Sequence, residues 1–458
     1  MTKTEQIRKK EFMGVEPIGS LLWKLSLPAT VGMLANALYN LVDTIFIGQG
    51  VGSLGIAGIS IAFPLQMIVS ALAQMFGVGA ASIVALKLGE GDEESAAKAA
   101  GNAMIMAVGV AAIYAILGSI FIDPLLNFVG VTEAIKPYAK DYLSIIYIGS
   151  IFLSFAMCCL NIIRAEGNAK EAMFIMLIGT ILNVILDPIL IFGFNMGIKG
   201  AAIATIVSQM SSTAFSLRYF LSGKSVLNLK RSSFVIKFTM VRQTILLGTS
   251  TFIRQIGNSI VAILMNNFLG IYGGNEAIAA FGMINKLTIF FLMPMFGIVQ
   301  GFQPIAGFNF GAKKYSRVRQ VMKYTIIVCS LYGLFISIIN ITFSRQLLLM
   351  FGADEQVLKI AIPALRVLMS TMVFIGIQVI GSTYFQAIGD SVPAILFGLS
   401  RQFFILIPIL LILPQMFGLI GIWISSPIAD IIATLVTTIG VIVALKKLPK
   451  QDVVKVIG

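Results

Sequence analysis

Three aspartates stand well inside long apolar stretches of this 458-residue chain: Asp43, Asp187 and Asp430. The remaining acidic residues fall in polar segments or at the ends of apolar ones. A charged side chain at the centre of a bilayer costs about 2.5–3.5 kcal/mol or more, so an acid that is kept there is a candidate for function. For Asp430, an ion pair with a buried base is as good an interpretation as a coupling role.

Asp43 follows two asparagines on one face of a predicted helix. Asn36, Asn40 and Asp43 are spaced four and three residues apart, which places them on a single helical stripe. We expect this stripe to face protein or water. Hydrogen bonding between neighbouring helices is the alternative role for the two asparagines.

A second polar group precedes a proline. Asn183 and Asp187 are four residues apart, and Pro188 cannot donate a backbone hydrogen bond to the carbonyl of Val184. Carboxylate, amide and carbonyl oxygens suit a hard monovalent cation, and two neighbouring carboxylates can also hold a proton. We expect Asp43 and Asp187 to share one cavity, although Asp187 could instead merely cap a kinked helix.

The elements that carry these residues are predicted to be membrane-spanning helices. The chain is 58% hydrophobic and 12% charged, with a mean hydropathy of +0.95, and about 20 apolar residues suffice to cross a bilayer. Apolar windows cover 18–48, 54–86, 97–122, 138–162, 171–193, 198–221, 242–270, 277–305, 320–344, 357–386, 393–416 and 419–445. We therefore predict an all-α integral membrane protein with twelve transmembrane helices.

The two halves of the chain repeat at an offset of 222 residues. At this offset six glycines of the first half meet six of the second: Gly48, Gly52, Gly79, Gly89, Gly130 and Gly167 meet Gly270, Gly274, Gly301, Gly311, Gly352 and Gly389. Six spans per copy give two parallel repeats with a cleft between them, as in many transporters. The predicted units are an N-terminal lobe (1–221), a connecting loop (222–241) and a C-terminal lobe (242–458).

Charge predicts the orientation. With both termini placed in the cytoplasm, 24 of the 33 basic residues fall on that side, which satisfies the positive-inside rule. The net charge of +13 therefore reflects membrane topology, and we expect the lipid bilayer rather than nucleic acid as the partner. The chain has no histidine, and Cys158, Cys159 and Cys329 lack ligand spacing, so no cofactor is expected.

The stretches LYNLVDTIFIGQG and LNVILDPILIFG…GIKGAAIAT, with the FGVGA and LGEGD signals, resemble the multidrug and toxic compound extrusion (MATE) family, in particular its MepA-like branch. The resemblance implies that Asp43, Asn183, Asp187 and Thr205 bind the coupling ion, H⁺ or Na⁺. Spans seven and ten lack the interior acids that some members use, which places coupling in the N-terminal lobe. Candidates for the substrate cleft are Asn36, Asn40, Gln255, Asn258, Asn266 and Lys286.

These features predict an exporter of cationic or amphipathic small molecules, which moves substrate outward as H⁺ or Na⁺ moves inward across the cell membrane. A flippase for lipid or polyprenyl-linked precursors is the alternative, because Arg254 could bind a phosphate. An enzyme is not expected, since no hydrolase, zinc-protease or P-loop motif is present. We expect a monomer.

Overall fold

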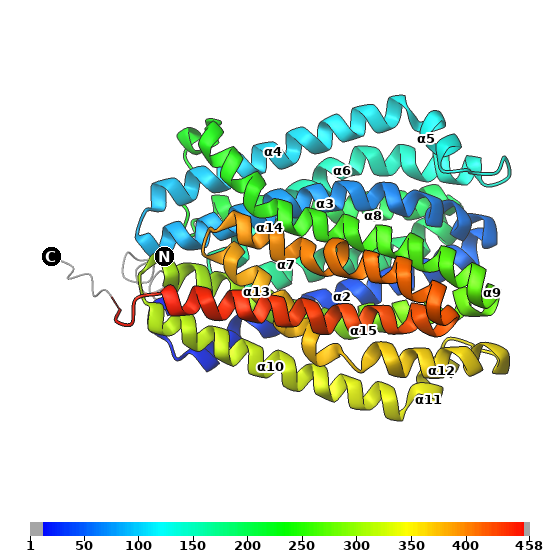
Figure 1. Cartoon of the computed structure of the whole chain (residues 1–458). Coiled ribbons are helices and arrows are strands. Elements are labelled where there is room, and N and C mark those ends of the chain that lie inside the picture. Colours follow the sequence, from blue (N-terminus) through cyan, green and yellow to red (C-terminus); the bar gives the residue numbers. More distant parts are fainter. Residues whose placement is uncertain (1–11, 453–458) are drawn as a thin grey trace.

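The computed structural model describes residues 12–452, except for the side chains of Asn40, Leu41 and Ser53. This part of the chain is a bundle of long helices with no strand (Figure 1). The first half contains α2 (Ile18–Val51), α3 (Ser53–Glu90), α4 (Glu93–Ile120), α5 (Ile122–Phe128), α6 (Lys136–Ala165), α7 (Ala169–Pro188), the π-helix η1 (Ile189–Gly193) and α8 (Gly197–Leu221).

The second half begins after a short 3-10 turn, η2 (Arg231–Phe234). Its helices are α9 (Phe238–Gly311), α10 (Tyr315–Thr342), α11 (Ser344–Leu349), α12 (Glu355–Met369), α13 (Met372–Ala387), α14 (Ser391–Leu399), the π-helix η3 (Ser400–Leu406) and α15 (Ile407–Lys447). Two of them are interrupted: Gly274 in α9 has φ 66° and ψ −163°, and Gly418 in α15 has φ 57° and ψ −135°. Each break joins two helices that turn back on one another.

The described residues supply twelve membrane spans. Eight helical stretches are long and apolar enough to cross a bilayer, and the bent pair α12 and α13 makes a ninth. Gly274 and Gly418 divide two of these stretches, which raises the number to eleven. The twelfth is α8, whose 25 residues span about 37 Å. The predicted fold class is confirmed, although the seventh span begins at Phe238 rather than at 242.

The two halves repeat in backbone geometry as well as in sequence. Three of the glycine pairs found at the 222-residue offset have positive φ in both members: Gly52 (80°) with Gly274 (66°), Gly130 (78°) with Gly352 (75°), and Gly167 (83°) with Gly389 (84°). Glycine adopts this region at little cost because it has no Cβ. Equivalent turns of the two six-helix lobes therefore need the same residue, which explains why the repeat is visible in glycines.

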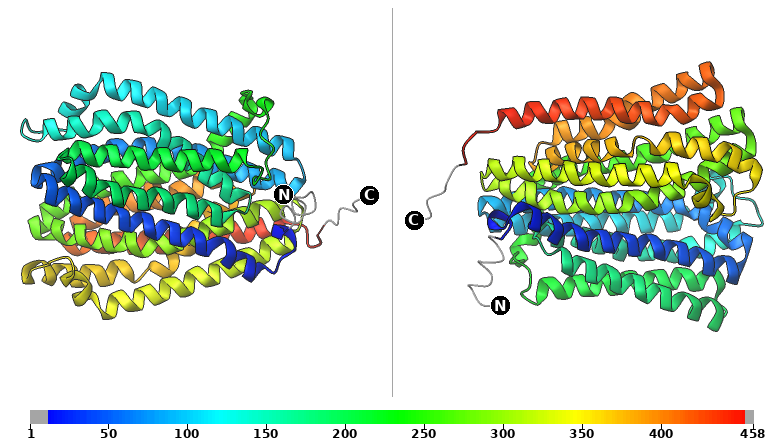
Figure 2. Two further views of the ribbon diagram at one scale, coloured as in Figure 1. Left: turned by 180° about the vertical axis from the view of Figure 1, so that it is seen from behind. Right: turned by 90° about the horizontal axis from the view of Figure 1, so that it is seen from below.

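The lobes share buried cores at one end of the bundle, the end that carries residues 12 and 452 (Figures 1 and 2), here called the termini side. There Leu21 and Leu25 of α2 pack in one cluster with Phe302 of α9 and Tyr384 of α13. At the opposite end, one cluster contains only N-lobe residues and another only C-lobe residues. Within the described chain, the lobes are thus joined on the termini side and have separate cores at the far end.

Two glycines bring the backbones of the two lobes into close contact. A Cβ added to Gly89 of α3 would lie 2.0 Å from the carbonyl oxygen of Phe308, and one added to Gly311 of α9 would lie 2.1 Å from that of Leu86. The partners are themselves related by the 222-residue offset, so the two contacts are copies of each other. Only residues without a Cβ allow backbones to pack this closely.

We expect Gly311→Ala to destabilise this seam, because the new methyl group would overlap backbone that cannot rotate away. Overpacking of this kind costs about 1–3 kcal/mol. Thermal unfolding of the purified protein in detergent measures the loss. Gly109→Ala in α4 is the matched control, since an added Cβ there meets nothing within 4 Å. Equal melting temperatures for Gly311→Ala and Gly109→Ala would contradict the prediction.

The connection between the lobes is held against the N-terminal lobe by two buried side chains. Glu166, 1% exposed, accepts hydrogen bonds from Ser225 Oγ at 2.7 Å and from the backbone N–H of Val226 at 2.8 Å. Asn102 Oδ1 accepts from the backbone N–H of Lys237 at 2.7 Å. The segment from Ser225 to Lys237 is therefore tied to the N-terminal lobe.

Candidate functional site

Four polar residues predicted to bind the coupling ion come together inside the N-terminal lobe. Asp43 lies on α2, Asn183 and Asp187 on α7, and Thr205 on α8. Their exposed fractions are 9%, 2%, 0% and 6%. The three helices pack side by side, and the i, i+4 spacing of Asn183 and Asp187 turns both side chains inward.

Asn183 connects α7 to α8. In the amide orientation that satisfies both neighbours, its Nδ2 donates to Asp187 Oδ2 at 2.9 Å and its Oδ1 accepts from the backbone N–H of Thr205 at 3.3 Å. This amide therefore fixes the position of the Asp187 carboxylate relative to α8.

Asp43 and Asp187 lie within hydrogen-bonding contact of each other. Such a contact requires a proton between the two carboxyl groups. Among the described residues neither acid forms an ion pair with lysine or arginine, and Asp43 Oδ1 is buried without a hydrogen-bond partner. A bound proton or a small cation would compensate the charge and occupy the open acceptor.

The helix changes its winding directly after Asp187. Pro188 ends α7, and the next five residues form the π-helix η1. Proline has no N–H to donate to the carbonyl of Val184, and the wider π turn that follows accommodates the interruption. Winding defects of this kind occur frequently at functional sites because they aim side chains or backbone oxygens at a ligand.

Sequence reasoning missed two tyrosines at this site. The hydroxyl of Tyr39 hydrogen-bonds Thr205 and lies near Asp43. Tyr142 of α6 lies near both aspartates, and its hydroxyl accepts from Gln66 Nε2 at 3.4 Å. Tyr39 could have been found, because it precedes Asp43 by four residues and shares its helical face. Tyr142 comes from a distant span, and no local pattern marks it.

The other predicted site residues are the candidates for the substrate cleft. Gln255 is half-buried, and Asn36, Asn266 and Lys286 are exposed. Asn258 Oδ1 accepts from Gln402 Nε2 at 3.0 Å, a contact within the C-terminal lobe. The side chain of Asn40 is outside the described residues. Whether these residues line a substrate cleft stays a prediction.

Asp430 forms an ion pair. Its Oδ1 lies 2.5 Å from Arg401 Nε, and its Oδ2 accepts from Thr371 Oγ1 at 2.9 Å. Arg401 sits on the second π-helix, η3. Of the two interpretations open for Asp430, the structure supports the ion pair. Of the three aspartates inside apolar stretches, Asp43 and Asp187 are therefore the two without a basic partner in the described part of the chain.

No group of three or more histidine, cysteine or acidic residues that could hold a metal ion occurs among residues 12–452. The oxygen atoms around Asp43 and Asp187 nevertheless suit a monovalent cation. The two carboxylates and the Thr205 hydroxyl supply oxygen atoms, which hard ions prefer, whereas Asn183 orients the Asp187 carboxylate through its Nδ2. The three cysteines are buried and unpaired.

The chain forms two helical lobes related by an internal repeat. One lobe contains a buried pair of carboxylates that has no basic partner among the described residues, and this combination is typical of a membrane transporter. The MatE family model matches residues 28–189 and 250–412, once in each lobe. The chain therefore belongs to the MatE family, the multidrug and toxic compound extrusion transporters. Membership places it among transporters rather than enzymes, and transporters of this family need no cofactor.

Comparison with individual proteins agrees with this assignment. The multidrug export protein MepA of Staphylococcus aureus is 27% identical over 92% of each chain. A solved outward-facing MATE family transporter of the MOP superfamily is 24% identical, with a TM-score of 0.91 over 98% of this chain and 100% of its own. A MOP superfamily transporter from Pyrococcus furiosus, described as having a binding pocket of reversed polarity, is 25% identical with the same TM-score and coverage.

Proposed function

We propose that this protein exports cationic or amphipathic small molecules in exchange for H⁺ or Na⁺. The observation that carries the proposal is the buried pair Asp43 and Asp187, which lacks a compensating base in the described chain. An acid pair of this kind is costly unless a cation binds it part of the time. The exporter activity named for the Staphylococcus aureus relative supports the direction and the type of substrate.

The mechanism follows from the arrangement of the lobes. With the termini side facing the cytoplasm, as proposed below, the lobes pack together on the inner side of the membrane and have separate cores on the outer side. We therefore take the outer side as the side from which the site is reached. From there a proton or Na⁺ reaches Asp43 and Asp187 and neutralises them. We expect binding to change how α2 packs against α7 and α8, to release substrate, and to let the lobes close at the far end and part on the termini side.

The test is transport by purified protein in liposomes. We expect efflux of a fluorescent lipophilic cation that depends on an imposed inward gradient of Na⁺ or H⁺, and a matching ion flux that depends on the substrate. Export that continues without either gradient would contradict ion coupling.

One observation favours a flippase as a second candidate. Arg254 is half-buried in α9 and forms no hydrogen bond or ion pair within the part of the chain that the structure describes. A free guanidinium could bind a lipid phosphate bidentately. The variant Arg254→Gln distinguishes the two functions. It should abolish flipping of a phospholipid analogue but leave gradient-driven efflux of a lipophilic cation largely intact.

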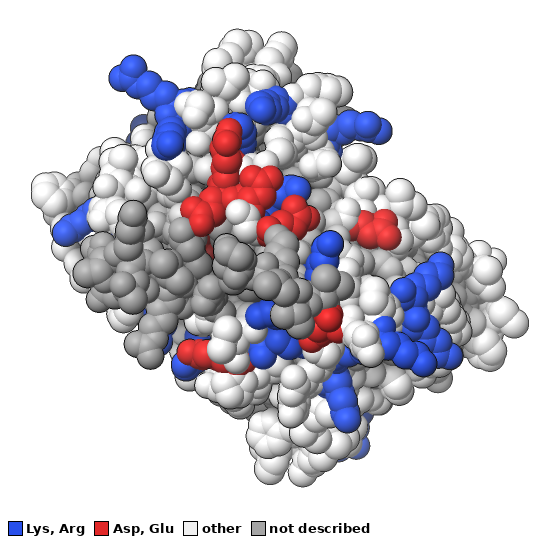
Figure 3. Space-filling model, turned by 90° about the vertical axis from the view of Figure 1, so that its left-hand side faces the viewer, with Lys and Arg blue, Asp and Glu red and all other residues white. Residues whose placement is uncertain are grey.

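We propose that the termini side faces the cytoplasm. Basic side chains surround a central group of acidic ones on this face (Figure 3), and the connecting segment is rich in lysine and arginine. We expect Ser232→Cys, in a protein without its native cysteines, to resist impermeant thiol reagents in intact cells and to react after lysis. Ser232 is exposed, so a lack of reaction in intact cells cannot come from burial.

The control for this orientation is Thr132→Cys. Thr132 is exposed in the loop between α5 and α6, at the opposite end of the bundle, and should react in intact cells. Labelling of position 232 but not 132 in intact cells would reverse the proposed orientation.

A further inference from the structure

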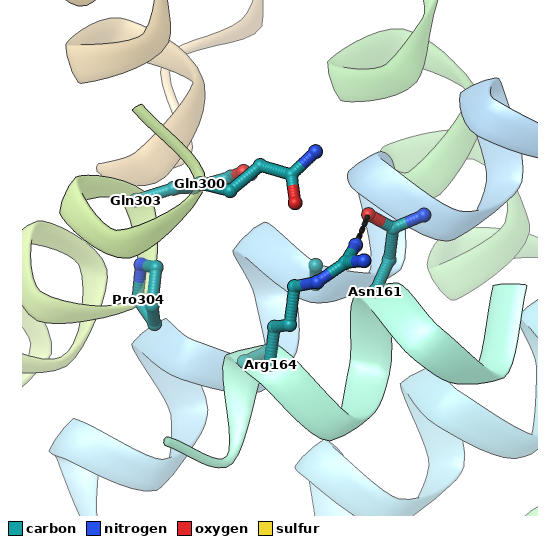
Figure 4. Close-up of a pocket in the computed structure, with 7 residues that line it drawn as sticks. Asn161, Arg164, Gln300, Gln303 and Pro304 are labelled. Carbon is teal, nitrogen blue, oxygen red and sulfur yellow. Dashed lines mark hydrogen bonds between the residues drawn. The ribbon is translucent and has the colours of Figure 1, made fainter. Parts of the chain in front are cut away.

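A small polar chamber lies between the lobes on the termini side (Figure 4). Its volume of about 10 Å³ gives room for about one water molecule. Asn161 and Arg164 reach into it from α6, and Gln300 and Gln303 extend toward them from α9. Ala81 of α3, Ala165 of α6 and Pro304 of α9 complete the lining.

Arg164 has no carboxylate partner among the described residues. The residue is 9% exposed, and its only hydrogen bond within the described chain runs from Nη1 to Asn161 Oδ1 at 3.4 Å. The nearest acid in sequence, Glu166, points away, because its carboxylate binds Tyr219, Ser225 and Val226. A buried guanidinium normally has a carboxylate partner.

The remaining polar atoms suit water rather than an anion. Gln300 Oε1 is buried without a hydrogen-bond partner, and Gln303 Nε2 already donates to Ser82 Oγ at 2.9 Å. A water molecule can accept from Arg164 and donate to Gln300 Oε1, whereas an anion would be repelled by that oxygen. A water molecule in this position would solvate the guanidinium and leave its positive charge in place.

The chamber lies between the carboxylate pair and the termini side. Arg164 is in the last turn of α6, whereas Asp187 is at the far end of α7, which runs back from the termini side. Because the chamber is lined by both lobes, a cation that crossed the termini side between the lobes would come close to this charge. Fixed arginine charges are effective barriers to cations and protons in narrow hydrated passages.

We propose that Arg164 is an electrostatic barrier that keeps H⁺, Na⁺ and cationic substrates from leaking between the lobes when the termini side is closed. This proposal rests on the proposed cation-coupled function and adds a residue that determines how tightly exchange is coupled. Arg164 makes no contact with the coupling site; its effect is that of a positive charge in a region of low dielectric constant.

The experiment measures leak without substrate. Protein is reconstituted into liposomes with an imposed gradient of Na⁺, and influx of radioactive Na⁺, efflux of iodide and permeation of glycerol are measured in parallel. We expect Arg164→Gln to raise substrate-independent Na⁺ influx at least about tenfold over the wild type, and Arg164→Lys to stay near the wild type because it keeps the charge.

A second pair of variants leaves Arg164 in place. Gln303→Glu puts a carboxylate across the chamber, neutralises the field and should raise Na⁺ influx as Arg164→Gln does. Gln303→Met is the matched control: it loses the same hydrogen bond to Ser82 without adding a charge, and its cation leak should stay low. This pair keeps the test informative even if Arg164→Gln does not fold.

Selectivity separates a barrier from loose packing. If the variants admit iodide and glycerol as readily as Na⁺, Arg164 only holds the lobes together, and the proposal is wrong. Unchanged Na⁺ influx in both Arg164→Gln and Gln303→Glu would also overturn it. Failure of the proposed function is distinguishable, because wild-type protein would then show no substrate-dependent ion flux, whatever its leak.

Discussion

Asp187→Asn is expected to abolish ion-driven export, with a loss of about 100-fold or more in gradient-dependent efflux. Asparagine has nearly the same shape, and Asn183 can still hydrogen-bond its amide oxygen, so the local structure survives. Removing the carboxylate removes the charge that attracts H⁺ or Na⁺, and a neutral amide costs less to bury than an ionised acid. We therefore expect the melting temperature to stay the same or to rise.

The measurement is dye efflux from liposomes at equal protein content, together with the melting temperature in detergent. Asp390→Asn is the matched control, because Asp390 is exposed at the beginning of α14 and the same atoms are exchanged there. Asp390→Asn should transport like the wild type. Gradient-driven efflux by Asp187→Asn at the wild-type rate would remove this carboxylate from the mechanism.

Most of the fold follows from patterns that the sequence displays directly. Apolar runs of spanning length predict the helices, because a helix that crosses the bilayer needs about 20 mostly apolar residues. The glycine repeat is visible because positive φ and interlobe backbone contact both require a missing Cβ. Gly89 and Gly311 show this: each is a loop-proximal glycine in sequence, and in the structure each lies against a carbonyl of the other lobe.

Spacing along the chain predicts contacts only within one helix, and Thr205 of another helix is added by the resemblance to the MATE family. Asn183, Asp187 and Pro188 lie within six residues, so their spacing alone brings them together. Tyr142 reaches Asp43 from a separate span, and no local pattern reports such a contact. Arg164 shows the same limit more clearly. Its position at the end of an apolar run predicts an ordinary basic residue on the cytoplasmic side, whereas the structure buries it between the lobes.

The ion pair of Asp430 illustrates the same limit. Asp430 lies inside an apolar run, as Asp187 does, and from the sequence an ion pair and a coupling role are equally good interpretations of it. Only the approach of Arg401 to 2.5 Å separates the compensated acid from the uncompensated ones. Whether an intramembrane acid stays a functional candidate therefore depends on the structure, which shows whether a lysine or arginine forms an ion pair with it.

Asp43 and Asp187 are expected to act as one unit rather than as two independent sites. They contact each other directly, so each ionised carboxylate disfavours ionisation of its neighbour, and a single proton or Na⁺ relieves both. If exchange needs this shared ion, loss of either acid removes the ion and stops coupling. Substituting the second acid as well should then reduce ion-driven export only slightly further.

A double-mutant cycle measures this dependence. Asp43→Asn, Asp187→Asn and the double variant are compared in gradient-driven efflux at matched reconstitution. We expect each single variant to lose about 100-fold or more, and the double variant to fall within about threefold of the weaker single. A control cycle that pairs Asp187→Asn with Asp390→Asn should show the Asp187 effect alone. Partial transport in both single variants, with losses that multiply in the double, would mean that the two carboxylates bind ions separately and that their contact is incidental to transport.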